Sequence, residues 1–92
     1  MNGRARLAWN VRRLRTARGI TQEQLAVDAR VAAPYLSRIE NGSVNPTIDV
    51  LDRLAGVLAV GVDELLRSPT EGSPPIETLK AGRKRQKADW SA

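Results

Sequence analysis

The polar side chains of this sequence are better suited to binding through charge and hydrogen bonds than to catalysis. The 92-residue chain contains no cysteine and no histidine, which removes disulfides, thiolate metal sites and the commonest general base and metal ligand of proteins. Its carboxylates occur where helix caps and helix surfaces are expected, so we predict neither an enzyme nor a cofactor or metal site. The formal net charge of +5 favours an acidic partner such as nucleic acid, or else a merely solvated basic surface.

Residues 31–38, "VAAPYLSR", contain few groups that could recognise a base. Arg38 is the side chain here that can bind guanine O6 and N7 with two hydrogen bonds, unless it is solvated or bound to a phosphate. Tyr35 can reach a phosphate or a base edge through its hydroxyl. Three residues offer no side-chain hydrogen bond but are small enough to contact a thymine methyl group: Ala32, Ala33 and Pro34.

Five helices would position these groups. Leu7, Val11 and Leu14 recur at the spacing of one helix face, and Gly19 is a typical helix stop. Thr21, followed three residues later by Gln24, predicts a capping box at the start of a second helix. Its inner face is expected at Leu25, Ala26 and Ala29.

The third helix is predicted from about Ala32 to Glu40, with Leu36 and Ile39 facing inward, and Asn41-Gly42 ending it. A fourth helix is predicted after a Thr47 cap, with the apolar stripe Ile48, Leu51, Leu54, Ala55 and Leu58. A fifth would run from Val62 to about Arg67, where Leu65 and Leu66 would close the core. The short link between the second and third helices forces a steep crossing, which is typical of a helix-turn-helix.

Three blocks of the sequence and the spacing between them resemble the XRE/Cro-like family of helix-turn-helix regulators: "RRLRTARGITQEQLA", "YLSRIENG" and "NPTIDVLDRLAGVLAVGVDELL". The resemblance runs from about Asn10 to Leu66. It implies an all-α, compact five-helix, lambda-repressor-like DNA-binding domain, which we place over residues 1–67. Residues 68–92 are rich in Pro, Ser and Gly and then basic, and this composition predicts a disordered basic tail. Such a domain would bind double-stranded DNA at a palindromic operator as a homodimer, with its third helix in the major groove.

The resemblance also implies roles for individual residues. Gln22, at the start of the second helix, would lie where a helix N-terminus faces a phosphate, and Arg15 and Glu40 would form a structural ion pair. We expect Arg38 to be the main base reader. The whole expected DNA-binding set is Gln22, Ala32, Ala33, Pro34, Tyr35, Ser37, Arg38, Asn41, Gly42, Ser43 and Asn45.

A dimer surface is expected on the fourth and fifth helices, following the habit of the family and the surplus of apolar residues there: Val57, Val60, Val62 and Leu66. No apolar run reaches the roughly 18 residues of a membrane span, and no secretory signal is visible, so we expect a cytoplasmic protein without a membrane partner.

Three positions depart from the family pattern. Arg30 and Ala59 stand where glycine is usual, and Ala32 replaces the usual Ser or Thr cap. These departures and the poor set of base readers leave an alternative open, a protein-interaction module of anti-activator or antitoxin type that keeps the fold without operator binding. The basic cluster at residues 80–87 would either follow phosphates or keep the chain soluble, and Trp90 would either dock on a partner or have no role.

Overall fold

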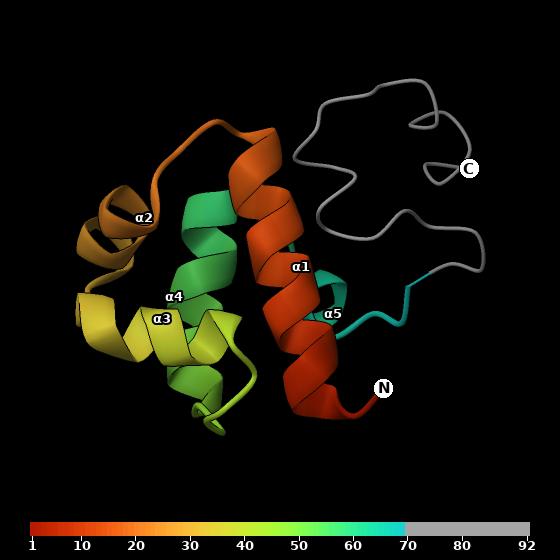
Figure 1. Cartoon of the computed structure of the whole chain (residues 1–92). Coiled ribbons are helices and arrows are strands. Elements are labelled where there is room, and N and C mark those ends of the chain that lie inside the picture. Colours follow the sequence, from red (N-terminus) through yellow and green to blue (C-terminus); the bar gives the residue numbers. More distant parts are fainter. Residues whose placement is uncertain (70–92) are drawn as a thin grey trace.

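A computed structural model describes residues 1–69 of the chain, and these residues form an all-helical unit (Figure 1). The predicted fold class is confirmed. The basic cluster at residues 80–87 and Trp90 lie outside the described residues, as does the predicted tail from residue 70 onward. The described helices are α1 Gly3–Ala17, α2 Gln22–Ala29, α3 Ala33–Glu40, α4 Ile48–Leu58 and α5 Val62–Leu65.

The starts of α2 and α4 follow from their caps, as predicted. Thr21 Oγ1 accepts a hydrogen bond from the Gln24 amide at 3.0 Å, and Gln24 Oε1 accepts one from the Thr21 amide at 3.1 Å. Thr47 Oγ1 accepts from the Val50 amide at 3.2 Å. Helix α3 begins at its predicted N-terminus without such help, because its cap residue Ala32 has no side-chain acceptor.

Two helices end in a residue with left-handed backbone conformation that is not glycine. Arg30 ends α2 with φ 60° and ψ 46°, and Ala59 ends α4 with φ 60° and ψ 42°. In both turns the amide of the following residue donates a hydrogen bond back to the helix. Val31 donates to the Ala26 carbonyl, and Val60 donates to the Ala55 carbonyl. A side chain in this conformation costs about 1–2 kcal/mol, so both turns are strained in the same way.

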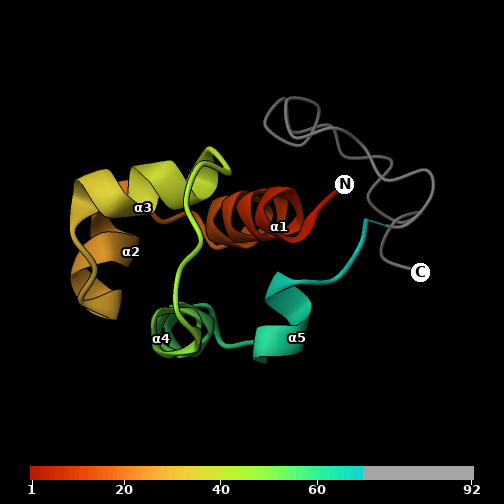
Figure 2. The ribbon, with the colours of Figure 1, turned by 90° about the horizontal axis from the view of Figure 1, so that it is seen from below.

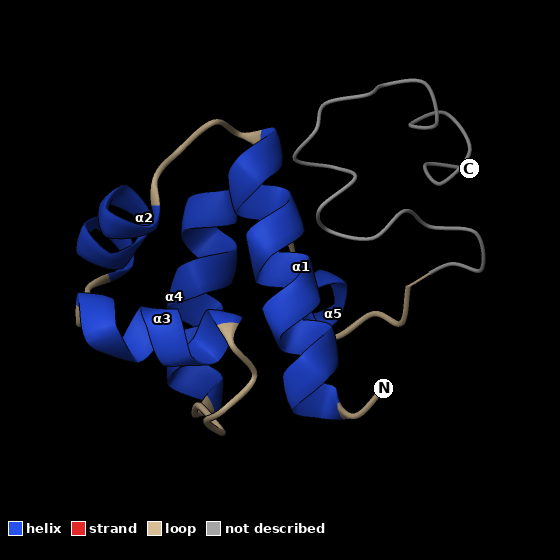
Figure 3. Ribbon diagram, in the orientation of Figure 1, coloured by secondary structure: helices blue, strands red, loops and turns tan. Residues whose placement is uncertain are grey.

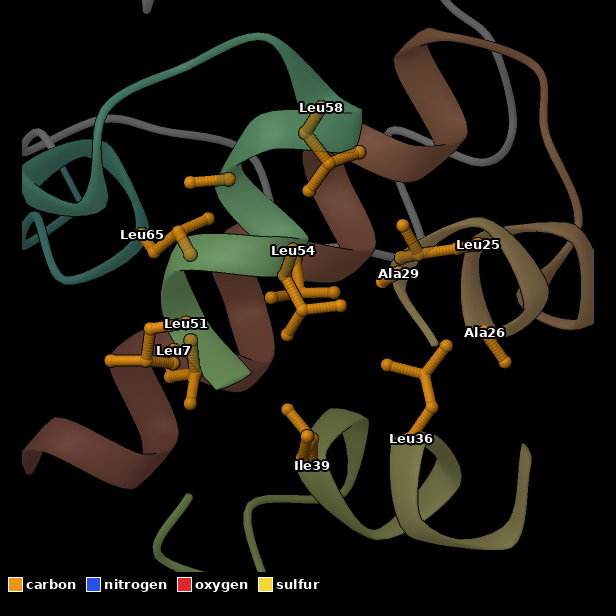
Figure 4. Packing of buried hydrophobic residues seen from close by; sticks show 12 residues of the cluster. Leu7, Leu25, Ala26, Ala29, Leu36, Ile39, Leu51, Leu54, Leu58 and Leu65 are labelled. Carbon is orange, nitrogen blue, oxygen red and sulfur yellow. The ribbon is translucent and has the colours of Figure 1, made fainter. Parts of the chain in front are cut away.

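The core lies between α1, α2, α3 and α4 and is closed by α5. Figure 4 shows Leu36 and Ile39 pointing from α3 into this space, as the sequence predicts. Twelve buried apolar residues form the core cluster: Leu7, Val11, Leu25, Ala26, Ala29, Leu36, Ile39, Leu51, Leu54, Ala55, Leu58 and Leu65.

Two predicted core positions are wrong. Ile48 is 63% exposed, because it is the first residue of α4 and lies outside the stripe that starts at Leu51. Leu66 is 37% exposed, because α5 ends at Leu65 and not near Arg67 as predicted, so the chain turns Leu66 outward. The fifth helix therefore contributes one fully buried leucine to the core.

The helices leave two separate faces on the molecule. Figure 2 shows α1 and α3 on one side and α4 and α5 on the other, with α2 beside both α3 and α4. An exposed surface on α3 can therefore meet one partner while α4 and α5 meet another. Within residues 1–69 no helix has the length and apolar character needed to span a bilayer.

Candidate nucleic-acid interface

The outer face of α3 is the most accessible part of the predicted DNA-binding set. Residues 30–32 join α2 to α3 (Figure 3), so the two helices cannot lie antiparallel and α3 projects its first turns outward. Ala32, Ala33, Pro34 and Arg38 are exposed, whereas Tyr35 and Ser37 are half-buried. A duplex could thus approach the backbone of α3 closely, since the exposed side chains at its start, Ala32, Ala33 and Pro34, are small.

Arg38 lies in the last turn of α3, and its backbone is well anchored. The Arg38 carbonyl accepts hydrogen bonds from the Ser43 amide at 3.0 Å and from Ser43 Oγ at 3.2 Å. In the described part of the chain its guanidinium makes no ion pair or hydrogen bond. The side chain is therefore available to a ligand while its main chain stays fixed.

Glu40 is the centre of a hydrogen-bond network that fixes the base of α3. Its carboxylate is 4% exposed and accepts two hydrogen bonds from Arg15, from Nε at 2.8 Å and from Nη2 at 3.1 Å. Gln22 Nε2 donates a third at 3.1 Å. Arg15 also donates to the Ile20 carbonyl at 3.1 Å. The network joins α1, the start of α2 and the end of α3, so it sets the angle at which α3 is presented.

Gln22 is the first residue of α2 and is half-buried. Its side-chain nitrogen donates to Glu40, a contact that no local sequence pattern predicts. Its amide oxygen stays available, as do the first backbone amides of α2, which the Thr21 cap satisfies only in part. The expected phosphate contact at this position remains a prediction.

The loop after α3 passes close to α1. Gly42 has φ +74°, and a Cβ atom placed there would lie 3.6 Å from the Arg4 carbonyl oxygen. Asn41, Ser43 and Asn45 are exposed along the same loop. The Asn41 and Ser43 amides are bonded back to carbonyls of α3, so the exposed side chains of this loop are its accessible polar groups. The phosphate-binding role of the loop stays a prediction.

Asn10 is a buried polar residue whose role the sequence did not reveal. It is 1% exposed, and its Nδ2 donates to the carbonyls of Leu65 and Arg67, both at 2.9 Å. It thereby ties α5 to α1. One signal was present, because Asn10 lies three residues after Leu7, on the predicted apolar stripe of the first helix.

Arg13 packs beside Asn10 on the surface of α1. Its Nη2 donates to Asn10 Oδ1 at 3.2 Å, and its guanidinium carbon lies 5.1 Å from the centre of the Trp9 ring. Burial lowers the pKa of the Arg13 guanidinium, with Glu64 opposing that change and Arg67 adding to it. Trp9 is half-buried, so the arginine and the ring cover this part of the core together.

The four residues predicted for the dimer surface lie on or near α4 and α5. Val57, Val60 and Val62 are half-buried and pack against the core, while Leu66 is exposed. Helices α4 and α5 lie on the side of the molecule away from α3 (Figure 2).

Sequence comparison identifies the family. The profile of the family described as "Helix-turn-helix" matches residues 11–65. The chain belongs to this XRE-like helix-turn-helix family of transcriptional regulators. The match includes α2, α3 and α4 whole, so the resemblance seen in the three sequence blocks is confirmed.

Several relatives within the helix-turn-helix family are similar in sequence to this chain over most of its length. An uncharacterised regulator of Sinorhizobium fredii, y4dJ, is 38% identical over 80% of this chain and 95% of its own length. The regulator DdrOP3 of Deinococcus deserti is 36% identical over 66% of this chain, which spans only 47% of that protein. Among solved structures, the hypothetical transcription factor NHTF from Neisseria is 32% identical with a TM-score of 0.69, covering 87% of this chain and 85% of its own.

Proposed function

We propose that the chain is a sequence-specific DNA-binding transcriptional regulator, acting as a repressor on a palindromic operator. The observation that supports this most directly is the presentation of α3, which is held at its base by Glu40 and is exposed along its outer face. Helix α3 would enter the major groove, with the remaining contacts made to phosphates by the start of α2 and the loop at residues 41–45.

Arg38 would supply the direct reading of sequence. A bidentate contact from its guanidinium to guanine distinguishes that base by about 1–3 kcal/mol. Ala32, Ala33 and Pro34 would add thymine-methyl contacts and let the duplex approach, while DNA deformability would supply further discrimination. Tyr35 and Ser37, being half-buried, would serve as supporting polar contacts.

The proposal is tested by selecting duplexes from a random pool with the purified chain. We expect a palindromic consensus containing a guanine in each half-site, and we expect Arg38→Ala to lose that guanine preference. Arg38→Lys serves as the matched control, because lysine keeps the charge and loses the fork geometry. Recovery of no consensus above the bare attraction of a basic protein for DNA would overturn the proposal.

The operator-binding form would be a homodimer that uses Val57, Val60, Val62 and Leu66. Pairing through the apolar residues of α4 and α5 would leave the outer face of α3 uncovered in both copies of the dimer. Such a pair reads half-sites about 34 Å apart, one turn of the duplex. The spacing in the selected consensus therefore reports on the dimer as well.

A protein partner is the second candidate function. The complex of the SinR and SinI proteins contains a chain that is 27% identical to this one with a TM-score of 0.67, covering 90% of this chain. A regulator with this fold is thus found in a protein–protein complex. If the selection recovers no consensus, this chain would act through such a partner instead.

A further inference from the structure

We propose that Arg30, at the turn between α2 and α3, is a phosphate-binding residue that anchors the start of α3 on DNA. The inference deepens the proposed function and depends on it. No expected role in DNA binding was assigned to this residue from the sequence.

The first observation is the backbone of Arg30 itself. Its φ of 60° places it in the left-handed region, which favours glycine. Because the Arg30 side chain is exposed, packing against the core does not offset the cost of this conformation. Backbone strain of this kind is enriched at functional sites.

The second observation is that the guanidinium has no internal partner. Within the described part of the chain, Arg30 makes no side-chain hydrogen bond and no ion pair. Its neighbour Arg53 differs, because Arg53 Nε donates to the Ala29 carbonyl at 2.9 Å. Arg30 and Arg53 border one shallow hollow, whose other lining residues are Asp28, Gly56 and Val57. Of the two arginines, Arg53 is the one with an internal hydrogen bond.

The third observation is the position of Arg30 relative to Arg38. Arg30 stands two residues before Ala32, the cap of α3, whereas Arg38 lies in the last turn of that helix. Eight helical residues span about 12 Å, which is close to the width of the major groove. The two arginines therefore bracket α3, one at each end.

The scarcity of positive charge around α3 favours a DNA-binding role for both Arg30 and Arg38. Between Gln22 and Asn45 they are the two basic residues, and of the three carboxylates in that stretch, Glu23, Asp28 and Glu40, the last is already paired with Arg15. Without Arg30 the start of α3 would approach the polyanion with no positive charge beside it. We therefore assign Arg38 to a base and Arg30 to a phosphate of the flanking strand.

The test measures affinity across a salt series on two probes, the duplex selected by the wild-type chain and a random-sequence duplex. Three variants are compared: Arg30→Gly, Arg30→Lys and Ala59→Gly. The last is the matched control, because Ala59 has nearly the same φ and ψ and no charge. Sedimentation verifies that the variants keep one oligomeric state.

We expect Arg30→Gly to reduce the slope of log K against log salt concentration by about 0.9 per binding site on both probes. Its loss of affinity would then be about threefold larger at 50 mM than at 200 mM salt. Arg30→Lys and Ala59→Gly should keep the wild-type slope. Both glycine variants should unfold at a higher temperature than wild type, which shows that lost affinity does not come from lost folding.

Three outcomes would overturn the assignment. If Arg30→Gly keeps the wild-type slope while Arg38→Ala loses the guanine preference, the phosphate contact is wrong and the proposed function stands. If Arg30→Gly changes the selected sequence and not the slope, Arg30 reads a base. If wild type shows neither sequence preference nor salt-dependent binding, the proposed function and this inference both fail.

Discussion

Arg15 on α1 and Glu40 at the end of α3 form a two-point ion pair, with nitrogen–oxygen distances of 2.8 and 3.1 Å, although 25 residues separate them in the chain. An exposed ion pair of this kind would contribute about 0–1 kcal/mol to stability. The structure places Glu40 almost wholly out of solvent. Gln22 at the start of α2 donates to the same carboxylate, so the Glu40 interactions fix the orientation of both α2 and α3.

Replacing one member of this pair should destabilise the fold strongly. We expect Arg15→Met to lower the free energy of unfolding by about 3 kcal/mol, because it leaves a buried carboxylate without its cation. Urea denaturation followed by circular dichroism measures the change. The double variant Arg15→Met with Glu40→Leu should lose less than the sum of the two single variants. Strictly additive losses would show that the two groups do not interact.

Local signals made much of the fold predictable from the sequence. The box formed by Thr21 and Gln24 and the cap at Thr47 act within four residues, so the residue types alone located the starts of α2 and α4. The inward direction of Leu36 and Ile39 followed from helical spacing. Arg30 and Ala59 were identified as non-glycine residues at turns that favour glycine, and their positive φ values agree.

Contacts between distant parts of the chain were not predictable in this way. Asn10 binds carbonyls at residues 65 and 67, and Arg53 binds the carbonyl of Ala29, and no spacing rule connects these positions. Ile48 and Leu66 were misplaced for a different reason. Each stands at a helix boundary, where a shift of one residue turns a side chain from the core to the solvent.

The two glycines Gly42 and Gly56 should respond oppositely to replacement by alanine. Gly42→Ala should cost about 1–2 kcal/mol, because φ of +74° disfavours any Cβ, although the added atom would meet only ordinary contacts. Gly56→Ala should stabilise the protein by about 0.5–1 kcal/mol, since the position lies inside α4 with open space beside it. Thermal unfolding separates the two, and equal effects would contradict the backbone argument.

The proposed dimer can be tested at Leu66, which is the most exposed residue of that surface. We expect Leu66→Glu to raise the dimer dissociation constant by at least tenfold, because a carboxylate would be buried against the partner copy. Val27→Glu is the control, since Val27 is apolar and 71% exposed on α2 and is not part of the predicted dimer surface. Sedimentation equilibrium gives both constants. A Leu66→Glu chain that associates like wild type would place the dimer surface elsewhere.

Asn10→Ala should loosen α5 from the rest of the domain. The substitution leaves the carbonyls of Leu65 and Arg67 without their donor, and the first of these hydrogen bonds is buried. An unsatisfied buried acceptor costs about 1–3 kcal/mol, which urea denaturation measures.

Asn10→Asp is the matched control for this substitution, because it keeps the side chain's size and removes its donor. It should be at least as destabilised as Asn10→Ala, since a carboxylate would face two carbonyl oxygens. Both variants should also weaken dimerisation, because Leu66 follows directly on the segment that Asn10 holds. An Asn10→Ala chain as stable as wild type would mean that the two hydrogen bonds contribute nothing to holding α5 in place.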